Sequence, residues 1–382
     1  MVSEIFVTET PVDLTSAAAA PDALNEPGPS RISAADKWVK PNGPPVGVMF
    51  GARRITEDAD VWQHNAWDHV VLPDDYLEKA KEIYDFQKSH PVPEAVREQY
   101  NADPASYWNK FYAINRDAFF KDRNWLRSEF PELIACSEAD AGPKTVLEVG
   151  CGAGNSIFTL MKYNENPDLT VYATDYSATA VQVVKSNPMY PVPEHGKGKI
   201  HASVWDITST PSSDPSDTMA ALSLNHNAST EPATLPTPPA STFALPEGVE
   251  PGSVDVLTVI YVLSALHPKE WEQAIHNLYT ALKPGGILLM RDYGRNDLAQ
   301  IRIKKDRLLD PSIPHLYIRG DGTRVYFFEK EELKEMLERS PREAEGRMFE
   351  ISQLGEDRRM LVNRKERKQM YRIWLQVKAK KL

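Results

Sequence analysis

Cysteines, long apolar runs and an early arginine cluster are scarce or absent in this chain of 382 residues. Its two cysteines, Cys136 and Cys151, are too few for a disulfide framework or a zinc site, which favours a reducing compartment. No apolar run approaches the length that a membrane-spanning helix needs. The first residues include Glu4, Glu9 and Asp13 without an arginine cluster, which argues against a mitochondrial transit peptide. We therefore expect a cytoplasmic protein without a metal site or a membrane segment.

The overall charge is also unlike that of a typical nucleic-acid-binding protein. The formal net charge is −10, although a whole-chain value hides local patches. The stretch from Arg358 to Leu382 holds ten Lys and Arg residues against one acid, Glu366. Two interpretations stay open, a solvated basic tail and an edge that contacts phosphates. The candidate phosphate contacts in this stretch are Arg364, Lys365, Arg367 and Lys368.

The most informative motif joins an apolar strand to a glycine-rich turn and a helix, and it spans residues 145–155. Gly150 and Gly152 allow a sharp turn and a close approach of the backbone to a ligand. Asp175 ends the next strand, where a carboxylate can accept hydrogen bonds from both ribose hydroxyls of an adenosine. Asp206 ends a third strand and suits the adenine amino group. The pattern predicts a nucleoside pocket.

Glycine spacing alone also fits dinucleotide-binding dehydrogenases, so the other residues of the motif must distinguish the two classes. The turn reads E-V-G-C-G-A-G-N, which is the form of S-adenosylmethionine-dependent methyltransferases, and Lys283-Pro284-Gly285-Gly286 precedes a later strand as is common in that class. We predict an α/β fold, the Rossmann-like class I methyltransferase fold, with S-adenosyl-L-methionine as cofactor. A degenerate Rossmann domain without catalysis is the alternative.

The chain divides by composition into three parts. Residues 1–45 are rich in Ala, Pro, Ser and acids and should be disordered. Residues 46–135 are dense in aromatic and charged residues, which predicts a helical extension that packs across the core, covers the cofactor and binds RNA. Residues 136–382 should form the methyltransferase domain, with a parallel sheet, a closing antiparallel hairpin over 349–354 and 369–377, a helix over 327–339, and a flexible insertion at about 208–252.

Several segments could carry the chemistry. Residues 260–267 follow the fourth core strand, and in this class such a stretch usually contacts both the adenine and the target group. Here it lacks the [D/N/S]-P-P-[Y/F/W] motif with which many enzymes hold an exocyclic amino group. Aromatic residues alternate with Lys and Arg over 107–112 and 119–125, as expected where a base is stacked, although a packed helical lid explains them equally well. Asp292 and Tyr293 follow the fifth strand and are candidates for the acceptor pocket. Arg319 and Arg324 flank a tight turn that either binds RNA or is a hairpin with exposed charges.

In these motifs and segments the chain resembles the eukaryotic tRNA N3-methylcytidine methyltransferases, which modify cytidine 32 of the anticodon loop. The similarity extends from Gly51 onward except in the 208–252 insertion, and it includes Leu147–Asn155, Arg291–Gly294 and Arg319–Phe328. His64-Asn65-Ala66-Trp67-Asp68 is similar to the branch that acts on threonine tRNA. The Ser340–Gly346 segment departs from the family in its charge.

The resemblance implies roles for individual residues. Phe119 and Arg123 would help form the acceptor site. Lys121, between them, is a candidate RNA contact because of the alternation of aromatic and basic residues over 119–125. The cofactor contacts that it implies are Trp108, Tyr112, Gly150, Asp175, Asp206, Ile207 and Ile260. It also implies threonine tRNA as a partner, with an aminoacyl-tRNA synthetase as a possible protein partner.

The expected chemistry agrees with that resemblance. The N3 atom of cytosine is unprotonated near neutral pH, so it needs no general base, and the methylated base carries a positive charge that Asp292 and Tyr293 would stabilise. N3 lies on the Watson–Crick edge, so the base must be turned outward. Two other functions stay open: methylation of a protein or a small molecule, and RNA binding without turnover.

Overall fold

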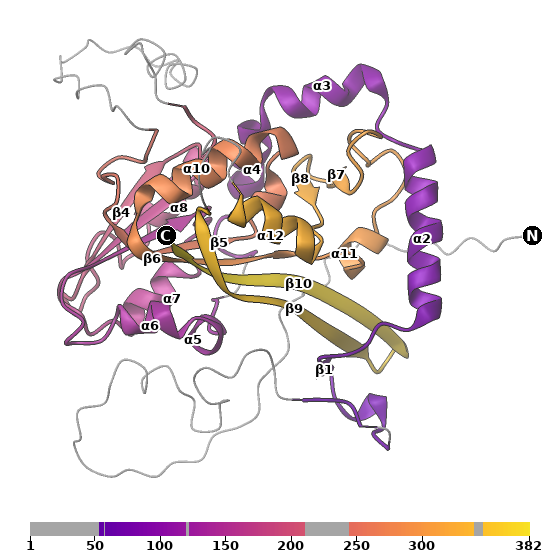
Figure 1. Ribbon diagram of the computed structural model, residues 1–382, viewed down its shortest axis with the longest axis horizontal. Coiled ribbons are helices and arrows are strands. Elements are labelled where there is room, and N and C mark those ends of the chain that lie inside the picture. The colour runs from indigo at the N-terminus through magenta and orange to yellow at the C-terminus, as the bar shows by residue number, and fades with distance from the viewer. Residues whose placement is uncertain (1–52, 57, 120–121, 211–243, 340–346) are drawn as a thin grey trace, which may run out of the picture.

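The computed structural model describes residues 53–56, 58–119, 122–210, 244–339 and 347–382 (Figure 1). The proposed disordered start, Lys121 and most of the 208–252 insertion lie outside these residues. So does the Ser340–Gly346 segment that departs from the family pattern.

The core is a sheet of eight strands in the order β1-β9-β10-β6-β5-β2-β3-β4. Five neighbouring strands are parallel, and three antiparallel strands extend the sheet beyond β6. The parallel strands are β2 (Lys144–Val149), β3 (Leu169–Asp175), β4 (Lys199–Val204), β5 (Val254–Ile260) and β6 (Leu282–Tyr293). The antiparallel strands are β1 (Ala66–Asp68), β9 (Phe349–Asn363) and β10 (Lys368–Lys381). The predicted Rossmann-like α/β fold is confirmed.

Helices cover both faces of this sheet because neighbouring strand residues point to opposite sides. Val146 packs into one core and Leu147 into the other, and both are buried. A buried aliphatic side chain of this size stabilises the fold by about 1.5–3 kcal/mol. The helices on the Leu147 face are α10 (Trp271–Ala281) and α12 (Lys330–Glu338). The helices on the Val146 face are α5 (Leu126–Glu129), α6 (Pro131–Ala135), α7 (Ile157–Lys162) and α8 (Ala178–Lys185).

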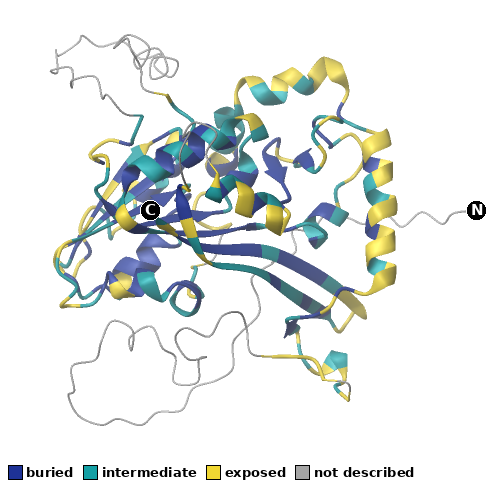
Figure 2. Ribbon diagram, in the orientation of Figure 1, coloured by how far each residue is buried: buried dark blue, intermediate teal, exposed yellow. Residues whose placement is uncertain are grey.

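The described residues before α5 form three α-helices, one strand and one short 3-10 helix around this core. The helices are α2 (Asp74–Ser89), α3 (Glu94–Ala102) and α4 (Pro104–Asn115). Pro104 occupies the first turn of α4, and the Asp103 side chain caps it by accepting from the Ser106 backbone N–H at 3.1 Å. The sequence did not predict β1, whose Trp67 is buried against Met360 of the hairpin. Figure 2 shows that α2 and α3 expose much of their outer surface.

Short elements complete the structure between β5 and β9. They are η2 (Leu263–Ala265), η3 (Pro268–Glu270), α11 (Leu298–Ile301), β7 (Leu316–Ile318) and β8 (Arg324–Tyr326). An additional short helix, η1 (Val61–Gln63), precedes β1. The helix predicted over 327–339 begins only at Lys330, because Phe327 and Phe328 continue from β8 into the core and are fully buried.

The basic stretch from Arg358 onward is not a solvated tail, so that interpretation is wrong. The stretch lies within the β9–β10 hairpin, whose strands are longer than the segments predicted from the sequence. Two of its cations are buried in ion pairs: Arg372 with Asp297 at 2.9 Å and Lys378 with Glu132 at 2.9 Å. Four exposed cations gather at the turn of the hairpin, namely Arg364, Lys365, Arg367 and Lys368.

Candidate cofactor and acceptor site

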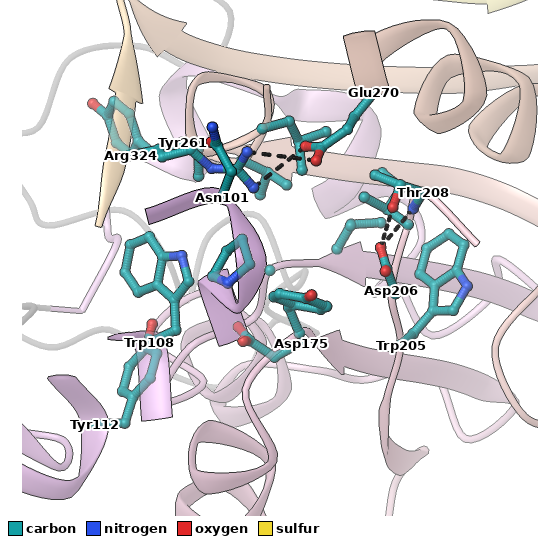
Figure 3. Close-up of a pocket in the computed structure, with 18 of the residues that line it drawn as sticks. Asn101, Trp108, Tyr112, Asp175, Trp205, Asp206, Thr208, Tyr261, Glu270 and Arg324 are labelled. Carbon is teal, nitrogen blue, oxygen red and sulfur yellow. Dashed lines mark hydrogen bonds and ion pairs between the residues drawn. The ribbon is translucent and has the colours of Figure 1, made fainter. Parts of the chain in front are cut away.

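A cavity of about 230 Å³ lies at the carboxyl ends of the parallel strands (Figure 3). Gly150 follows β2, Asp175 ends β3 and Tyr261 follows β5, so three neighbouring strands deliver residues to one edge. This edge is where ligands bind in open α/β sheets. The predicted residues that line the cavity are Trp108, Tyr112, Gly150, Asp175, Asp206, Ile207 and Arg324.

The glycine turn after β2 packs so closely that side chains would not fit. Gly150 and Gly152 have φ values of +65° and +56°, in the left-handed region that favours glycine. A Cβ at Gly150 would lie 2.4 Å from Cγ2 of Val262, and one at Gly152 would lie 2.6 Å from the Tyr112 hydroxyl. Gly152 is not itself among the lining residues, but its backbone N–H donates to Oδ2 of Asp175 at 2.8 Å. The turn therefore packs against Val262 on one side and against Tyr112 of the N-terminal extension on the other.

Asp175 is the buried carboxylate at the centre of the site. Its Oδ1 accepts from the backbone N–H of Ser177 at 2.8 Å, as its Oδ2 does from Gly152. Burial raises its pKa to about 6, while the two backbone hydrogen bonds oppose that rise. A carboxylate held in this way keeps further lone pairs for ligand hydroxyls.

Asp206 and Ile207 form the wall beyond β4. Oδ1 of Asp206 accepts from the Thr208 backbone N–H at 2.8 Å and from its hydroxyl at 2.7 Å, which fixes the turn. Ile207 is buried, and its carbonyl accepts from Asn277 of α10 at 2.7 Å. The wall thus places one carboxylate and one apolar side chain side by side in the cavity.

Helix α4 supplies the opposite wall. Trp108 and Tyr112 line the cavity one helical turn apart, with ring centroids 6.3 Å apart. Oδ1 of Asn109 accepts from the Ser177 hydroxyl at 2.7 Å and from the Thr179 backbone N–H at 3.2 Å, which ties α4 to the start of α8. This helix therefore closes the site next to Asp175.

Two predicted acceptor residues, Phe119 and Arg123, lie outside the cavity lining. Phe119 is 53% exposed, and its ring packs edge-on against Phe111. Arg123 points toward the core, where it donates to the Ser156 hydroxyl at 2.9 Å and pairs with Glu148 at 3.5 Å. Their contact with an acceptor base stays a prediction.

Asp292, Tyr293 and Ile260 also lie behind the cavity surface. Asp292 is fully buried, and its carboxylate accepts from the backbone N–H groups of Ser264 at 3.0 Å and Tyr293 at 2.8 Å. Burial raises the pKa of Asp292 to about 6. The Tyr293 ring lies 4.8 Å from that of Tyr261, which does line the cavity. Ile260 is buried at the end of β5, immediately before Tyr261.

The two arginines of the 319–324 turn take different positions. Arg319 lies over the Tyr293 ring at 5.3 Å. Arg324 is buried, lines the cavity and pairs with Glu270 at 3.4 Å, so its charge is not exposed. Of the residues that line the cavity, Arg324 is the one Lys or Arg, and Asp175, Asp206 and Glu270 are its acids. His267 caps η3 by accepting from the Lys269 backbone N–H at 3.2 Å.

Other lining residues were missed by the sequence analysis. Tyr176 directly follows Asp175 and Thr208 lies two residues after Asp206, so their positions could have been inferred. Nothing local marks Asn101 or Pro104, because α3 and α4 reach the site through tertiary packing. The other missed residues are Ala102, Val149, Trp205 and Glu270. Tyr261, Val262, Ala265 and Leu266 also line the cavity and belong to the 260–267 stretch that was expected to contact the adenine and the target group.

These residues fit S-adenosyl-L-methionine. The buried Asp175 carboxylate suits a ribose, the Asp206 wall suits an adenine, and the turn at Gly150 leaves no Cβ between its backbone and a ligand. Among the described residues, no group of three or more His, Cys, Asp or Glu side chains could hold a metal ion. No helix in the described ranges is long and apolar enough to cross a membrane.

The fold and this site define a methyltransferase. Residues 123–340 match the family model described as a methyltransferase domain, and the chain belongs to that family.

Comparison with known proteins narrows the family further. A protein of Schizosaccharomyces pombe named "tRNA N(3)-methylcytidine methyltransferase trm140" is 42% identical over 336 residues, which cover 88% of this chain and 93% of the relative. A Danio rerio protein named "tRNA N(3)-cytidine methyltransferase METTL2" is 36% identical over 365 residues, which cover 87% of this chain and 89% of the relative. The chain belongs to the tRNA N3-methylcytidine methyltransferase family. It spans only 45% of the Saccharomyces cerevisiae relative, a "tRNA(Thr) (cytosine(32)-N(3))-methyltransferase", at 42% identity over 86% of this chain.

Proposed function

We propose that the protein methylates N3 of cytidine 32 in the anticodon loop of a tRNA, with threonine tRNA as the preferred substrate. The observation that carries this proposal is the cavity in which Asp175 and Asp206 face the aromatic wall of α4. The Saccharomyces cerevisiae relative, whose printed name gives this tRNA and this position, supports the choice of substrate.

The residues of the site have distinct tasks in this reaction. S-adenosyl-L-methionine supplies an electrophilic methyl group. Asp175 accepts hydrogen bonds from the ribose, and Asp206 with Ile207 holds the adenine. Trp108 and Tyr112 close the site and exclude water, which leaves the protein mainly the work of alignment.

The acceptor nitrogen needs no base from the protein, because its lone pair is free near neutral pH. The methylated cytosine carries a positive charge, and we propose that the Tyr293 ring and the Asp292 carboxylate stabilise it. We further propose that Phe119, Lys121 and Arg123 of the 46–135 extension guide the base, and that Arg319 and the cations at the hairpin turn contact the RNA. Arg324 is buried and can contact the RNA only where a nucleotide enters the cavity that it lines. A cytoplasmic location and delivery by an aminoacyl-tRNA synthetase belong to the same proposal.

The test uses purified full-length protein, labelled donor and transcripts of threonine tRNA. We expect label in the wild-type transcript and none in a transcript with C32→U. Label that persists after this change would refute the target position. Activity that survives nuclease treatment of a cell extract would point instead to a protein or small-molecule substrate.

A further inference from the structure

The turn of the β9–β10 hairpin packs against residues 60–65, which precede β1. Nη2 of Arg364 donates to Oδ1 of Asn65 at 2.7 Å, although the two residues are 299 positions apart in the chain. The guanidinium of Arg367 lies over the Trp62 ring, 4.3 Å from its centroid. Figure 1 shows β1 beside this end of the hairpin, away from the C-terminus. Two arginines of the turn are therefore held by one early segment.

The partners of these two arginines carry no charge. An amide and an indole ring hold a guanidinium without neutralising it, so its positive charge stays available to an anion. Asp60 is the acid of the 60–65 segment, and its side chain caps η1 by accepting from the Trp62 backbone N–H at 3.0 Å. Glu366 of the turn pairs with Lys368 at 2.7 Å. Both acids thus contact groups other than the two arginines.

Arg367 keeps an unfavourable backbone at this place. Its φ is +52°, in the left-handed region that glycine adopts readily and a residue with a Cβ does not. Hairpin turns usually carry glycine or asparagine at such positions. Its side chain is exposed, so burial of that side chain does not explain the choice of residue. A strained, exposed arginine points to a use for its side chain.

The 60–65 segment is itself fixed to the sheet. The Asn65 carbonyl accepts from the Val362 backbone N–H at 2.8 Å, and β1, which pairs with β9, follows directly. Nε1 of the buried Trp67 donates to the Val61 carbonyl at 2.9 Å. The side chains that hold the arginines therefore start from a fixed backbone, and groups that are oriented before a ligand binds lose less entropy on binding.

We propose that Trp62 and Asn65 are positioning residues for tRNA binding, which orient Arg367 and Arg364 toward phosphate groups of the RNA, a role that rests on the proposed function. Arginine binds a phosphate through two parallel N–H donors, so the direction of its guanidinium matters as well as its charge. The two uncharged side chains supply that direction and leave the charge free.

These arginines lie far from the base that is methylated. Trp374 of β10 pairs with Tyr293, one of the proposed acceptor residues. Arg367 precedes Trp374 by seven residues, which is about 20 Å along a strand that rises about 3.3 Å per residue. The affinity for tRNA, and not the affinity for the donor, is therefore the quantity that they should change.

The first test changes Trp62→Leu and Asn65→Ala separately in the full-length protein. Neither substitution removes a charge. We expect the Kd for a transcript of threonine tRNA, measured by filter binding at one salt concentration, to rise about threefold in each variant, because the arginines lose their fixed direction. The Kd for S-adenosylhomocysteine should not change.

Arg367→Gly separates the stability of the turn from RNA binding. Glycine adopts φ of +52° readily, and this gain offsets its greater freedom in the unfolded chain, so the melting temperature should stay near that of the wild type. The Kd for tRNA should rise at least threefold. In this background Trp62→Leu should have no further effect on that Kd, because a positioning residue acts through the group that it positions.

Tyr279→Leu is the matched control. Nζ of Lys381 lies over the Tyr279 ring, 4.2 Å from its centroid, at the opposite end of β10. The substitution removes an aromatic ring from a cation of the same hairpin, and the Kd for tRNA should stay near that of the wild type.

Three results would overturn the proposal: wild-type tRNA affinity in Trp62→Leu or in Asn65→Ala, an equal loss of affinity in Tyr279→Leu, or a further loss when Trp62→Leu is added to Arg367→Gly. Where Trp62→Leu does not fold, wild-type tRNA affinity in Arg367→Gly decides against it. A wild-type protein that binds tRNA but methylates none would refute the proposed function alone. Methylation of cytidine 32 together with wild-type tRNA affinity in Trp62→Leu would refute the role of Trp62 alone.

Discussion

Gly152 and Tyr112 meet at the edge of the cavity with no room for a methyl group between them: a Cβ at Gly152 would lie 2.6 Å from the phenol oxygen. Tyr112 belongs to α4 and Gly152 to the turn after β2, so the contact joins the extension to the core. The fit of the aromatic wall depends on the absence of a side chain at this glycine.

Gly152→Ala should therefore weaken donor binding as well as the fold. The positive φ alone makes alanine destabilising by at least about 1 kcal/mol, and the clash pushes Tyr112 from its place. We expect the Kd for S-adenosylhomocysteine to rise at least tenfold, as measured by calorimetry. Gly142→Ala is the matched control, because Gly142 has φ of +67° and nothing within 4 Å of a Cβ. Equal effects on Kd in the two variants would contradict the role of the Tyr112 contact.

Asp175→Ala should reduce donor affinity by about 1–3 kcal/mol, since a buried hydrogen-bonding partner of the ribose is lost. Equilibrium dialysis with labelled donor measures this change. The control is Asp255→Asn at the amino end of β5, where the carboxylate accepts from the Thr145 backbone N–H at 2.8 Å. That variant should lower stability and leave donor affinity unchanged. Wild-type donor affinity in Asp175→Ala would show that the ribose is held elsewhere.

The pKa of Asp175, raised to about 6, predicts how donor binding depends on pH. Below about pH 6 the protonated carboxyl loses acceptor capacity, so the affinity for S-adenosylhomocysteine should fall as pH decreases from 7 to 5. In Asp175→Asn this part of the pH dependence should vanish. A wild-type affinity that is flat across this range would contradict the assignment.

The Asp175 carboxyl should also make the free energy of unfolding depend on pH, in the direction opposite to that of donor affinity. The folded protein binds a proton at about pH 6 that the unfolded chain, with its ordinary aspartate pKa of 3.8, does not yet bind. Without donor, the contribution of Asp175 to the free energy of unfolding is therefore fully present below pH 3.8 and is lost as pH rises through about 6. Urea unfolding of the wild type and of Asp175→Asn between pH 4 and 8 measures this contribution as their difference.

Neutralising the exposed cations at the hairpin turn should weaken tRNA binding and reduce its salt dependence. Each lost phosphate contact lowers the slope of log K against log salt by about 0.7–0.9. Filter binding at several salt concentrations measures both quantities. The residues to change to serine together are Arg364, Lys365, Arg367 and Lys368.

A control for this experiment neutralises four exposed lysines on other elements. They are Lys185, Lys199, Lys330 and Lys334. An equal loss of the slope of log K against log salt in the two quadruple variants would indicate a diffuse charge effect. An unchanged slope in the hairpin variant would show that the hairpin turn is not part of the RNA-binding surface.

The sequence predicted the elements whose pattern is local. The glycine turn, Asp175 and Asp206 each follow an apolar strand, and the strand order of such a motif places them at one edge. The sequence could not show that Arg123 points toward Glu148 or that Arg324 is buried, because the direction of a long side chain depends on tertiary partners. For the same reason the sequence could not show which cations of the basic stretch are buried, because their partners Asp297 and Glu132 are far away in the chain.

The three residues of β1 register with Arg359, Met360 and Leu361, almost three hundred positions later. The strand at this edge of the sheet thus comes from a segment far before β9 in the chain and can pair only after β9 has been synthesised. Contacts of such long range slow folding. Removing β1 leaves β9 as the exposed edge of the sheet, and removing β10 takes away the strand that joins β9 and β1 to β6, so either loss should yield a partly assembled sheet.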